Sequence, residues 1–232
     1  MPDITLTIDG VTGALLLEEP DRVVPALVDT LAQAVGDGRE IGCARPLAVL
    51  PPAAATDEEI RAATCVRVAG YYHGSLVEGP GRRSSVLFQS CPLACPGCWV
   101  PELHDPRGGA LVPVERLAAA LLDPTYERDG VSLLGGEPMA QPEGLLALVR
   151  ALRAGGCAHI LCYSGYTYEA LRRKAVCRPA VGTVLDEIDM LVDGSYRADL
   201  AGSAGPWTGS GNQRVLALRR GVPSPWCPPG AP

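Results

Sequence analysis

Short apolar runs alternate with amphipathic helical segments from Cys65 onward, and this alternation constrains the fold more than any other feature. Runs rich in Val, Leu and Ile predict strands at residues 65–72, 84–88, 130–134, 158–163, 186–194 and 214–218. Apolar residues at helical spacing predict helices between them at residues 112–123, 141–156 and 166–175. Such alternation is typical of a parallel sheet built from right-handed strand–helix units, with ligands at the carboxyl ends of its strands.

The residues before Cys65 have a different pattern. Residues 3–19 predict two short strands around a turn that contains Gly, and residues 20–36 predict an amphipathic helix. The Pro- and Ala-rich stretch at 47–56, LAVLPPAAAT, predicts a linker. We therefore expect an α/β core with a small N-terminal α+β appendage, divided into residues 1–64 (appendage and linker), 65–220 (core) and 221–232 (Pro-rich tail).

The net charge and the cysteine content limit the classes of partner and the cellular compartment that we expect. The net charge is −6 and the chain has a single lysine, which argues against nucleic acid because phosphate binding needs clustered Lys and Arg. There is no signal peptide at the N-terminus and no apolar run of about 18 residues, so we expect no membrane association. Nine cysteines, an odd and mostly scattered set, indicate a reducing cytoplasm.

Three of these cysteines, Cys91, Cys95 and Cys98, lie close together in the turn-rich stretch SCPLACPGCW. Three interpretations are open. The thiols are reduced and buried; or they hold a structural zinc ion, for which His104 supplies the fourth ligand; or they bind an iron–sulfur cluster. A [4Fe–4S] cluster normally takes four thiolates, so three would leave one iron open to a small molecule with nitrogen and oxygen donors.

The cysteine spacing is followed, about 40 residues later, by the sequence GGEP at residues 135–138. Alone, GGEP is also an ordinary turn between a strand and a helix. Together and in this order, the two motifs resemble those of the radical S-adenosylmethionine (SAM) superfamily. The resemblance implies a [4Fe–4S] cluster on Cys91, Cys95 and Cys98, with SAM bound at the remaining iron. It also implies that one electron splits SAM into methionine and a 5′-deoxyadenosyl radical, which abstracts a hydrogen atom.

The resemblance implies further residues around SAM. Glycine allows the backbone to approach a ligand closely, and Glu137 supplies an anion for the methionine ammonium. The residues expected to bind this cosubstrate are Gly135, Gly136, Glu137, Pro138, Ser164, Trp99 and Asn212. Trp99 is expected over the cluster or the adenine, with an ordinary core position as the alternative. No catalytic residue beyond the cluster is predicted.

Four further motifs resemble those of the anaerobic ribonucleotide reductase activating proteins. They are the turn GPG-x-R at 79–83, SGY at 164–166, VDG at 192–194 and GS-x-NQR at 209–214, within a resemblance that covers residues 66–218. This family implies an incomplete (β/α) barrel, a glycyl-radical enzyme as protein substrate, and an external electron donor such as flavodoxin or ferredoxin. Two departures are Ser90, where the family commonly has Gly, and residues 1–64, which minimal activases lack.

Two other functions stay open: a radical SAM enzyme that modifies a peptide or small molecule, and a zinc-held binding module without catalysis. The core has roughly 150 residues, whereas a complete (β/α)₈ barrel takes about 250. An open, partial barrel exposes a radical to solvent unless something closes it. We therefore expect a macromolecular substrate to cover the cleft, with residues 1–64 helping to dock it.

Overall fold

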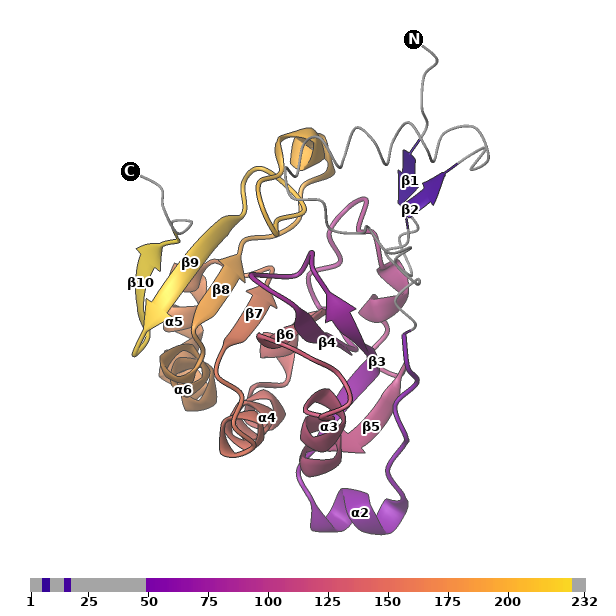
Figure 1. Cartoon of the computed structure of the whole chain (residues 1–232). Coiled ribbons are helices and arrows are strands. Elements are labelled where there is room, and N and C mark those ends of the chain that lie inside the picture. The colour runs from indigo at the N-terminus through magenta and orange to yellow at the C-terminus, as the bar shows by residue number, and fades with distance from the viewer. Residues whose placement is uncertain (1–5, 9–14, 18–48, 227–232) are drawn as a thin grey trace. The chain divides into compact units, whose positions relative to one another are not determined.

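The computed structural model describes residues 6–8, 15–17 and 49–226 (Figure 1). The chain divides into two compact units, Met1–Ala48 and Val49–Pro232. In the first unit, β1 (Leu6–Ile8) pairs in antiparallel fashion with β2 (Leu15–Leu17), which confirms the two short strands expected there. The helix expected at 20–36 lies outside the described residues, as do Cys43 and Cys227.

The second unit begins at Val49, before the domain boundary that we expected at residue 65. Leu50 forms a β-bridge with Tyr71, and the Ala55 N–H donates to the Leu111 carbonyl at 2.7 Å. Helix α2 (Asp57–Ala62) follows, capped by the side chain of Thr56. Residues 49–64 are therefore part of the second unit, and the three-part division stays a prediction.

One eight-stranded sheet forms the second unit. Its strands are β3 (Cys65–Ser75), β4 (Arg83–Phe88), β5 (Ala110–Pro113), β6 (Gly130–Gly135), β7 (Ile160–Ser164), β8 (Met190–Asp193), β9 (Arg214–Arg219) and β10 (Val222–Pro225). The order is β10-β9-β8-β7-β6-β4-β3-β5, and parallel pairing is limited to the neighbouring strands β4, β6, β7 and β8, whereas the other neighbours pair in antiparallel fashion. The expected α/β fold is confirmed, although the sheet is parallel only in its centre.

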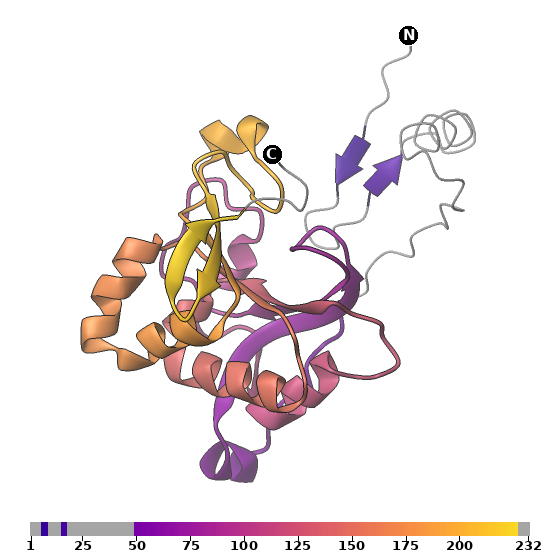
Figure 2. The same cartoon turned by 60° about the vertical axis from the view of Figure 1, so that its left-hand side comes forward.

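Helices cover one face of this sheet (Figures 1 and 2). They are α3 (Val114–Leu121), α4 (Pro142–Ala154), α5 (Tyr168–Cys177) and α6 (Pro179–Glu187). Their buried apolar stripes pack on the strands in one cluster, for example Leu117 of α3 and Leu148 of α4 with Val131 and Leu133 of β6. This core fixes the parallel strands, and therefore the loops that follow them.

Two strands were not predicted from the sequence, in each case because of residues in or beside the strand. The first two residues of the segment assigned to helix 112–123 belong to β5, because Pro113 stands at the N-cap and the helix begins only at Val114. Strand β10 lies in the expected tail. Arg220 and Gly221, both with positive φ (49° and 74°), form the two-residue turn that joins it to β9. Its prolines are tolerated because β10 is an edge strand.

A third difference concerns the strand predicted at 186–194. Pro179 starts a separate helix, α6, whose buried residues Val181, Val184 and Leu185 follow helical spacing. This helix extends to Glu187, so β8 is limited to four residues. The acidic residues at 186–189 therefore lie at the end of a helix and in the connection to β8.

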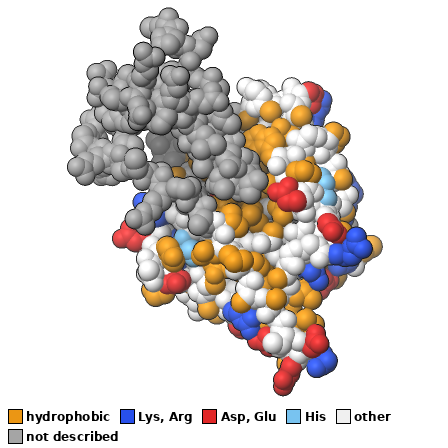
Figure 3. Space-filling view, turned by 90° about the vertical axis from the view of Figure 1, so that its right-hand side faces the viewer, with side chains coloured by type: hydrophobic (Ala, Val, Ile, Leu, Met, Phe, Trp, Pro, Cys, Tyr) orange, Lys and Arg blue, Asp and Glu red, His pale blue; other side chains and the backbone are white. Residues whose placement is uncertain are grey.

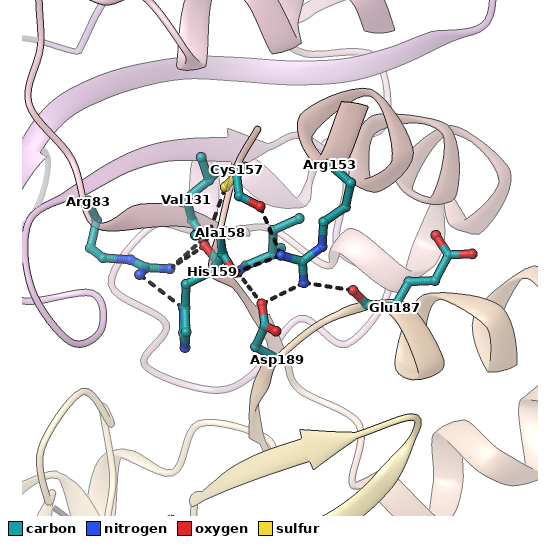
Figure 4. Close-up of polar contacts among 9 residues, drawn as sticks. Arg83, Val131, Arg153, Cys157, Ala158, His159, Glu187 and Asp189 are labelled. Carbon is teal, nitrogen blue, oxygen red and sulfur yellow. Dashed lines mark hydrogen bonds and ion pairs between the residues drawn. The ribbon is translucent and has the colours of Figure 1, made fainter. Parts of the chain in front are cut away.

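Two arginines fasten the strand ends opposite the cysteine loop (Figure 4). The Arg83 side chain is fully buried and donates to the carbonyl of Val131 at 2.6 Å and to Ser132 Oγ at 3.0 Å. Arg153 donates to the Cys157 carbonyl at 2.9 Å and to Asp189 Oδ2 at 2.6 Å. These bonds link the amino-terminal ends of β4 and β6 and the start of β8. They stabilise this end of the strands, whereas the carboxyl ends carry the loops of the cysteine site.

The surface gives two further observations. No helix in the described part of the chain is long and apolar enough to cross a lipid bilayer. On the face shown in Figure 3, acidic and basic side chains are interspersed around a central group of hydrophobic side chains.

Candidate functional site

The loop after β4 carries Cys91, Cys95 and Cys98, and its backbone is unusual. Ser90 (φ 79°), Ala94 (φ 44°) and Gly97 (φ 73°) all lie in the left-handed region. Such conformations cost free energy for residues with a Cβ, so neighbouring structure must hold them. The loop turns tightly here, and the Cys98 N–H donates to the Cys95 carbonyl at 3.1 Å.

The three thiols share one cavity of about 190 Å³. The other side of this cavity is formed by the carboxyl ends of the parallel strands, as expected for an α/β sheet. Besides the cysteines, its lining consists of Leu93, Val100, His104, Leu134, Gly135, Gly136, Tyr163, Ser164, Gly165, Gly194, Tyr196 and Gln213. Loops far apart in the sequence therefore converge on the cysteine loop.

The loop at Gly135 and Gly136 lies directly against the cysteine loop. The Gly136 N–H donates to the Phe88 carbonyl at 2.8 Å, and the Glu137 N–H donates to the Ser90 carbonyl at 2.9 Å. A Cβ on Gly136 would lie 2.5 Å from the Ser90 oxygen, and one on Gly135 would lie 2.6 Å from the Phe88 nitrogen. Glycine is needed here because two backbones meet without room for a side chain.

Glu137 is fully buried and lies behind the cavity wall rather than in it. Its carboxylate accepts hydrogen bonds from the N–H groups of Met139 (2.9 Å) and Gly165 (2.8 Å) and from Ser164 Oγ (3.0 and 3.1 Å). Burial raises the pKa of Glu137 to about 7, against the opposing effect of these hydrogen bonds. The side chain thus joins the loops that follow β6 and β7.

The structure separates the predicted site residues into two groups. The residues that line the cavity are Cys91, Cys95, Cys98, Gly135, Gly136 and Ser164. Outside the lining, Pro138 is buried in the short 3₁₀ helix Pro138–Ala140. Asn212 bonds to Ser210 and to the Ser195 carbonyl. The assignment of these residues to SAM stays a prediction.

Trp99 stands beside the cavity, with 63% of its surface exposed. Its Nε1–H donates to the hydroxyl of Tyr196 at 2.8 Å, and the two rings meet edge to face. Tyr196 itself lines the cavity. The pair links the cysteine loop to the loop after β8. No pattern in the sequence indicated Tyr196, because the contact joins segments about a hundred residues apart.

The donors in the cavity suit a cluster. All seven cysteines in the described part of the chain are free thiols, so Cys91, Cys95 and Cys98 are not tied up in disulfides. Burial raises the pKa of the Cys91 thiol. No three His, Cys, Asp or Glu side chains among the described residues converge closely enough to hold a single metal ion. Three thiols around one cavity are nevertheless the donor set of a four-iron cluster with one open iron. His104 Nε2 is buried at this cavity and has no hydrogen-bond partner among the described residues.

Comparisons with known proteins show the family to which the chain belongs. The family model described as "4Fe-4S single cluster domain" matches residues 77–216. The anaerobic ribonucleoside-triphosphate reductase-activating protein of Salmonella typhimurium is 33% identical over 162 residues, which are 66% of this chain and all of that protein. The Escherichia coli K12 protein of the same name is 33% identical over 159 residues, 64% of this chain and 97% of its own. The chain belongs to the radical SAM family of activating proteins.

Two further proteins match over shorter stretches. The pyruvate formate-lyase-activating enzyme of Clostridium pasteurianum is 36% identical over 97 residues, which are 40% of this chain and 41% of that enzyme. Among solved structures, QueE from Escherichia coli is 18% identical, with a TM-score of 0.38 over 49% of this chain and 58% of its own, and no conclusion rests on it.

Membership of this family establishes the cofactors and the general type of reaction. The chain is a radical SAM enzyme that uses a [4Fe–4S] cluster and SAM, and it is related to activating enzymes. The zinc-held module is set aside because the matched domain is one that holds a single [4Fe–4S] cluster. The enzyme class, the cofactors and the superfamily predicted from the sequence are thereby confirmed.

Proposed function

We propose that this enzyme generates a glycyl radical on a partner protein of the anaerobic ribonucleotide reductase type. The observation that carries the proposal is the match to the Salmonella typhimurium protein, which extends over the whole of that protein at 33% identity. We further propose that the open eight-stranded sheet is the incomplete barrel of the radical SAM fold. Its two edge strands, β5 and β10, are not paired with each other.

In this proposal the chain's own residues hold and orient the cofactors. Cys91, Cys95 and Cys98 bind the cluster, and the backbone at Gly135 and Gly136 approaches the methionine part of SAM. A cluster and SAM bound there would supply the one-electron chemistry that removes a hydrogen atom from the substrate. Glu137 holds together the loops after β6 and β7, because its carboxylate accepts hydrogen bonds from Met139, Ser164 and Gly165.

The partner is proposed to close the site. Tyr196 lines the cavity, and its hydrogen-bond partner Trp99 is largely exposed. A radical exposed to water and buffer reacts unproductively, so productive turnover needs a cover. A protein loop that carries the target glycine provides both cover and substrate, and the exposed aromatic pair gives it an apolar contact.

The test uses the full chain with its cluster reconstituted. The enzyme is incubated without oxygen with SAM, a reductant and a candidate glycyl-radical protein, and 5′-deoxyadenosine is measured. We expect slow cleavage of SAM alone, faster cleavage with the partner, and a carbon-centred radical on the partner by electron paramagnetic resonance. Efficient turnover of a free peptide or metabolite, with no radical on any such partner, would instead support the alternative radical SAM function.

The electron donor and the first unit are tested in the same assay. We propose that flavodoxin or ferredoxin supplies the electron, and each is compared with a chemical reductant. We also propose that the first unit helps to dock the partner. Deletion of residues 1–48 should lower the partner's effect on SAM cleavage and leave the cluster intact. Deletion of 1–64 should also destabilise the sheet, because it removes the bridge between Leu50 and Tyr71.

A further inference from the structure

His104 occupies a fixed position beside the cysteine loop. It ends the short 3₁₀ helix Pro101–His104, and its carbonyl accepts a hydrogen bond from the Cys91 N–H at 3.5 Å. The buried side chain of Gln89 donates to the carbonyls of Glu102 (3.0 Å) and Asp105 (2.8 Å), on either side of His104. The backbone that carries the imidazole is therefore held from three directions.

His104 lines the same cavity as Cys91, Cys95 and Cys98. Its Nε2 atom is buried, and none of the described residues gives it a hydrogen-bond partner. Nearly all buried polar atoms in folded proteins are hydrogen-bonded, so an exception at a ligand cavity indicates a partner that arrives with the ligand. A cluster held by the three cysteines of this cavity would bring sulfur atoms that can accept a hydrogen bond.

We infer that His104 Nε2–H donates a hydrogen bond to a sulfur atom of the bound cluster, either a cysteine thiolate or an inorganic sulfide. This inference rests on the proposed cluster site at Cys91, Cys95 and Cys98. A hydrogen bond to a cluster sulfur stabilises the more negative, reduced state and therefore raises the reduction potential. His104 is thus a positioning residue that makes the cluster easier to reduce, and it is not a fourth ligand.

The experiment measures the reduction potential of the cluster in the full chain, without SAM or partner. His104→Leu removes the donor and keeps an apolar side chain, whereas His104→Gln keeps an N–H near the position of Nε2. We expect the Leu variant to be about tenfold harder to reduce, which is 59 mV for a one-electron couple. The Gln variant should recover most of this change, at equal iron content.

A second measurement starts from the wild-type cluster. Pulsed electron paramagnetic resonance of the reduced wild-type cluster should show a coupled proton that is replaced by a coupled deuteron in heavy water, and the Leu variant should lose this signal. Unchanged potentials in both variants together with an unchanged proton signal would overturn the inference. A strongly coupled nitrogen would also overturn it, because it would make His104 a ligand.

The same data separate this inference from the proposed function. A Cys95→Ala variant that keeps its cluster would refute the cluster site itself. A wild-type cluster that shows the coupled proton but never produces a radical on a partner protein would refute only the proposed substrate. If the Leu variant fails to hold the cluster, the wild-type proton signal and the Gln variant decide the question.

Discussion

Ser164 Oγ lies 3.0 and 3.1 Å from the two carboxylate oxygens of Glu137, which accept its hydroxyl proton. Ser164 ends β7, and Glu137 follows the last residue of β6 by two positions. The contact therefore ties together two loops that meet at the cavity. A buried carboxylate in this position couples the stability of the site to pH.

Stability should fall as the pH rises through the range in which Glu137 ionises. Burial raises its pKa from 4.5 to about 7, so the folded chain binds this proton more tightly than the unfolded chain does. The contribution is full below about pH 4.5 and is lost by about pH 7; it amounts to about 3 kcal/mol at 1.36 kcal/mol per pKa unit. Urea unfolding of the cluster-free protein and of Glu137→Gln measures it. The variant should gain stability relative to wild type between pH 5 and 8, and a constant difference would contradict the assignment.

Replacement of any one of Cys91, Cys95 and Cys98 by Ala should abolish cluster binding and SAM cleavage. Each is expected to bind a different iron, and none of the three has a substitute thiol among the residues that line the cavity. Iron content after reconstitution and 5′-deoxyadenosine formation are the measurements. Cys162→Ala and Cys177→Ala are the matched controls, one buried and one exposed, and both should keep the cluster. Loss of iron in either control would refute the ligand assignment.

Gly136→Ala should displace the cysteine loop. The added Cβ would lie 2.5 Å from the carbonyl oxygen of Ser90, which is backbone and cannot rotate away. Overpacking of this kind costs about 1–3 kcal/mol, and here it should also lower the iron retained by reconstituted protein severalfold. Gly202→Ala is the control, because a Cβ there meets nothing within 4 Å. Equal stability and iron content in the two variants would show that the loops do not depend on this contact.

Ser90→Gly should stabilise the protein. Ser90 has a φ of 79°, in the left-handed region where a residue with a Cβ is strained. Glycine removes that strain but has more freedom to lose on folding, which leaves a gain of about 0.5–1 kcal/mol. Chemical unfolding of the cluster-free variant measures it. A loss of stability would mean that the serine hydroxyl matters more than the backbone strain.

Arg83→Ala should destabilise the sheet by about 3 kcal/mol. The guanidinium is fully buried, and its removal takes away the hydrogen bonds that it donates to the Val131 carbonyl and to Ser132 Oγ. Each unsatisfied buried group costs about 1–3 kcal/mol. The midpoint of urea unfolding should fall accordingly, whereas the exposed Arg173→Ala should change it little. If Arg83→Ala and the wild type unfolded at equal urea concentrations, water would replace the guanidinium without loss of stability.

The chemistry of this protein could be predicted from the sequence because the residues that indicate it lie in short local motifs. The spacing of Cys91, Cys95 and Cys98 and the sequence GGEP sufficed for the superfamily, the cofactors and the enzyme class. The central strands were also predictable, since buried parallel strands are continuous apolar runs bounded by turns. Strand β10 and helix α6 were missed because their prolines resemble breaks in regular structure.

The tertiary structure decided which residues face the cavity. Glu137 stands beside two glycines that line it, yet its side chain turns behind the wall because the N–H groups of Met139 and Gly165 and the hydroxyl of Ser164 offer it donors there. Tyr196 reaches the site only because β8 lies beside β7 in the sheet. Sequence motifs determine which residue types are available, but the direction of a side chain depends on partners that only the folded chain brings near.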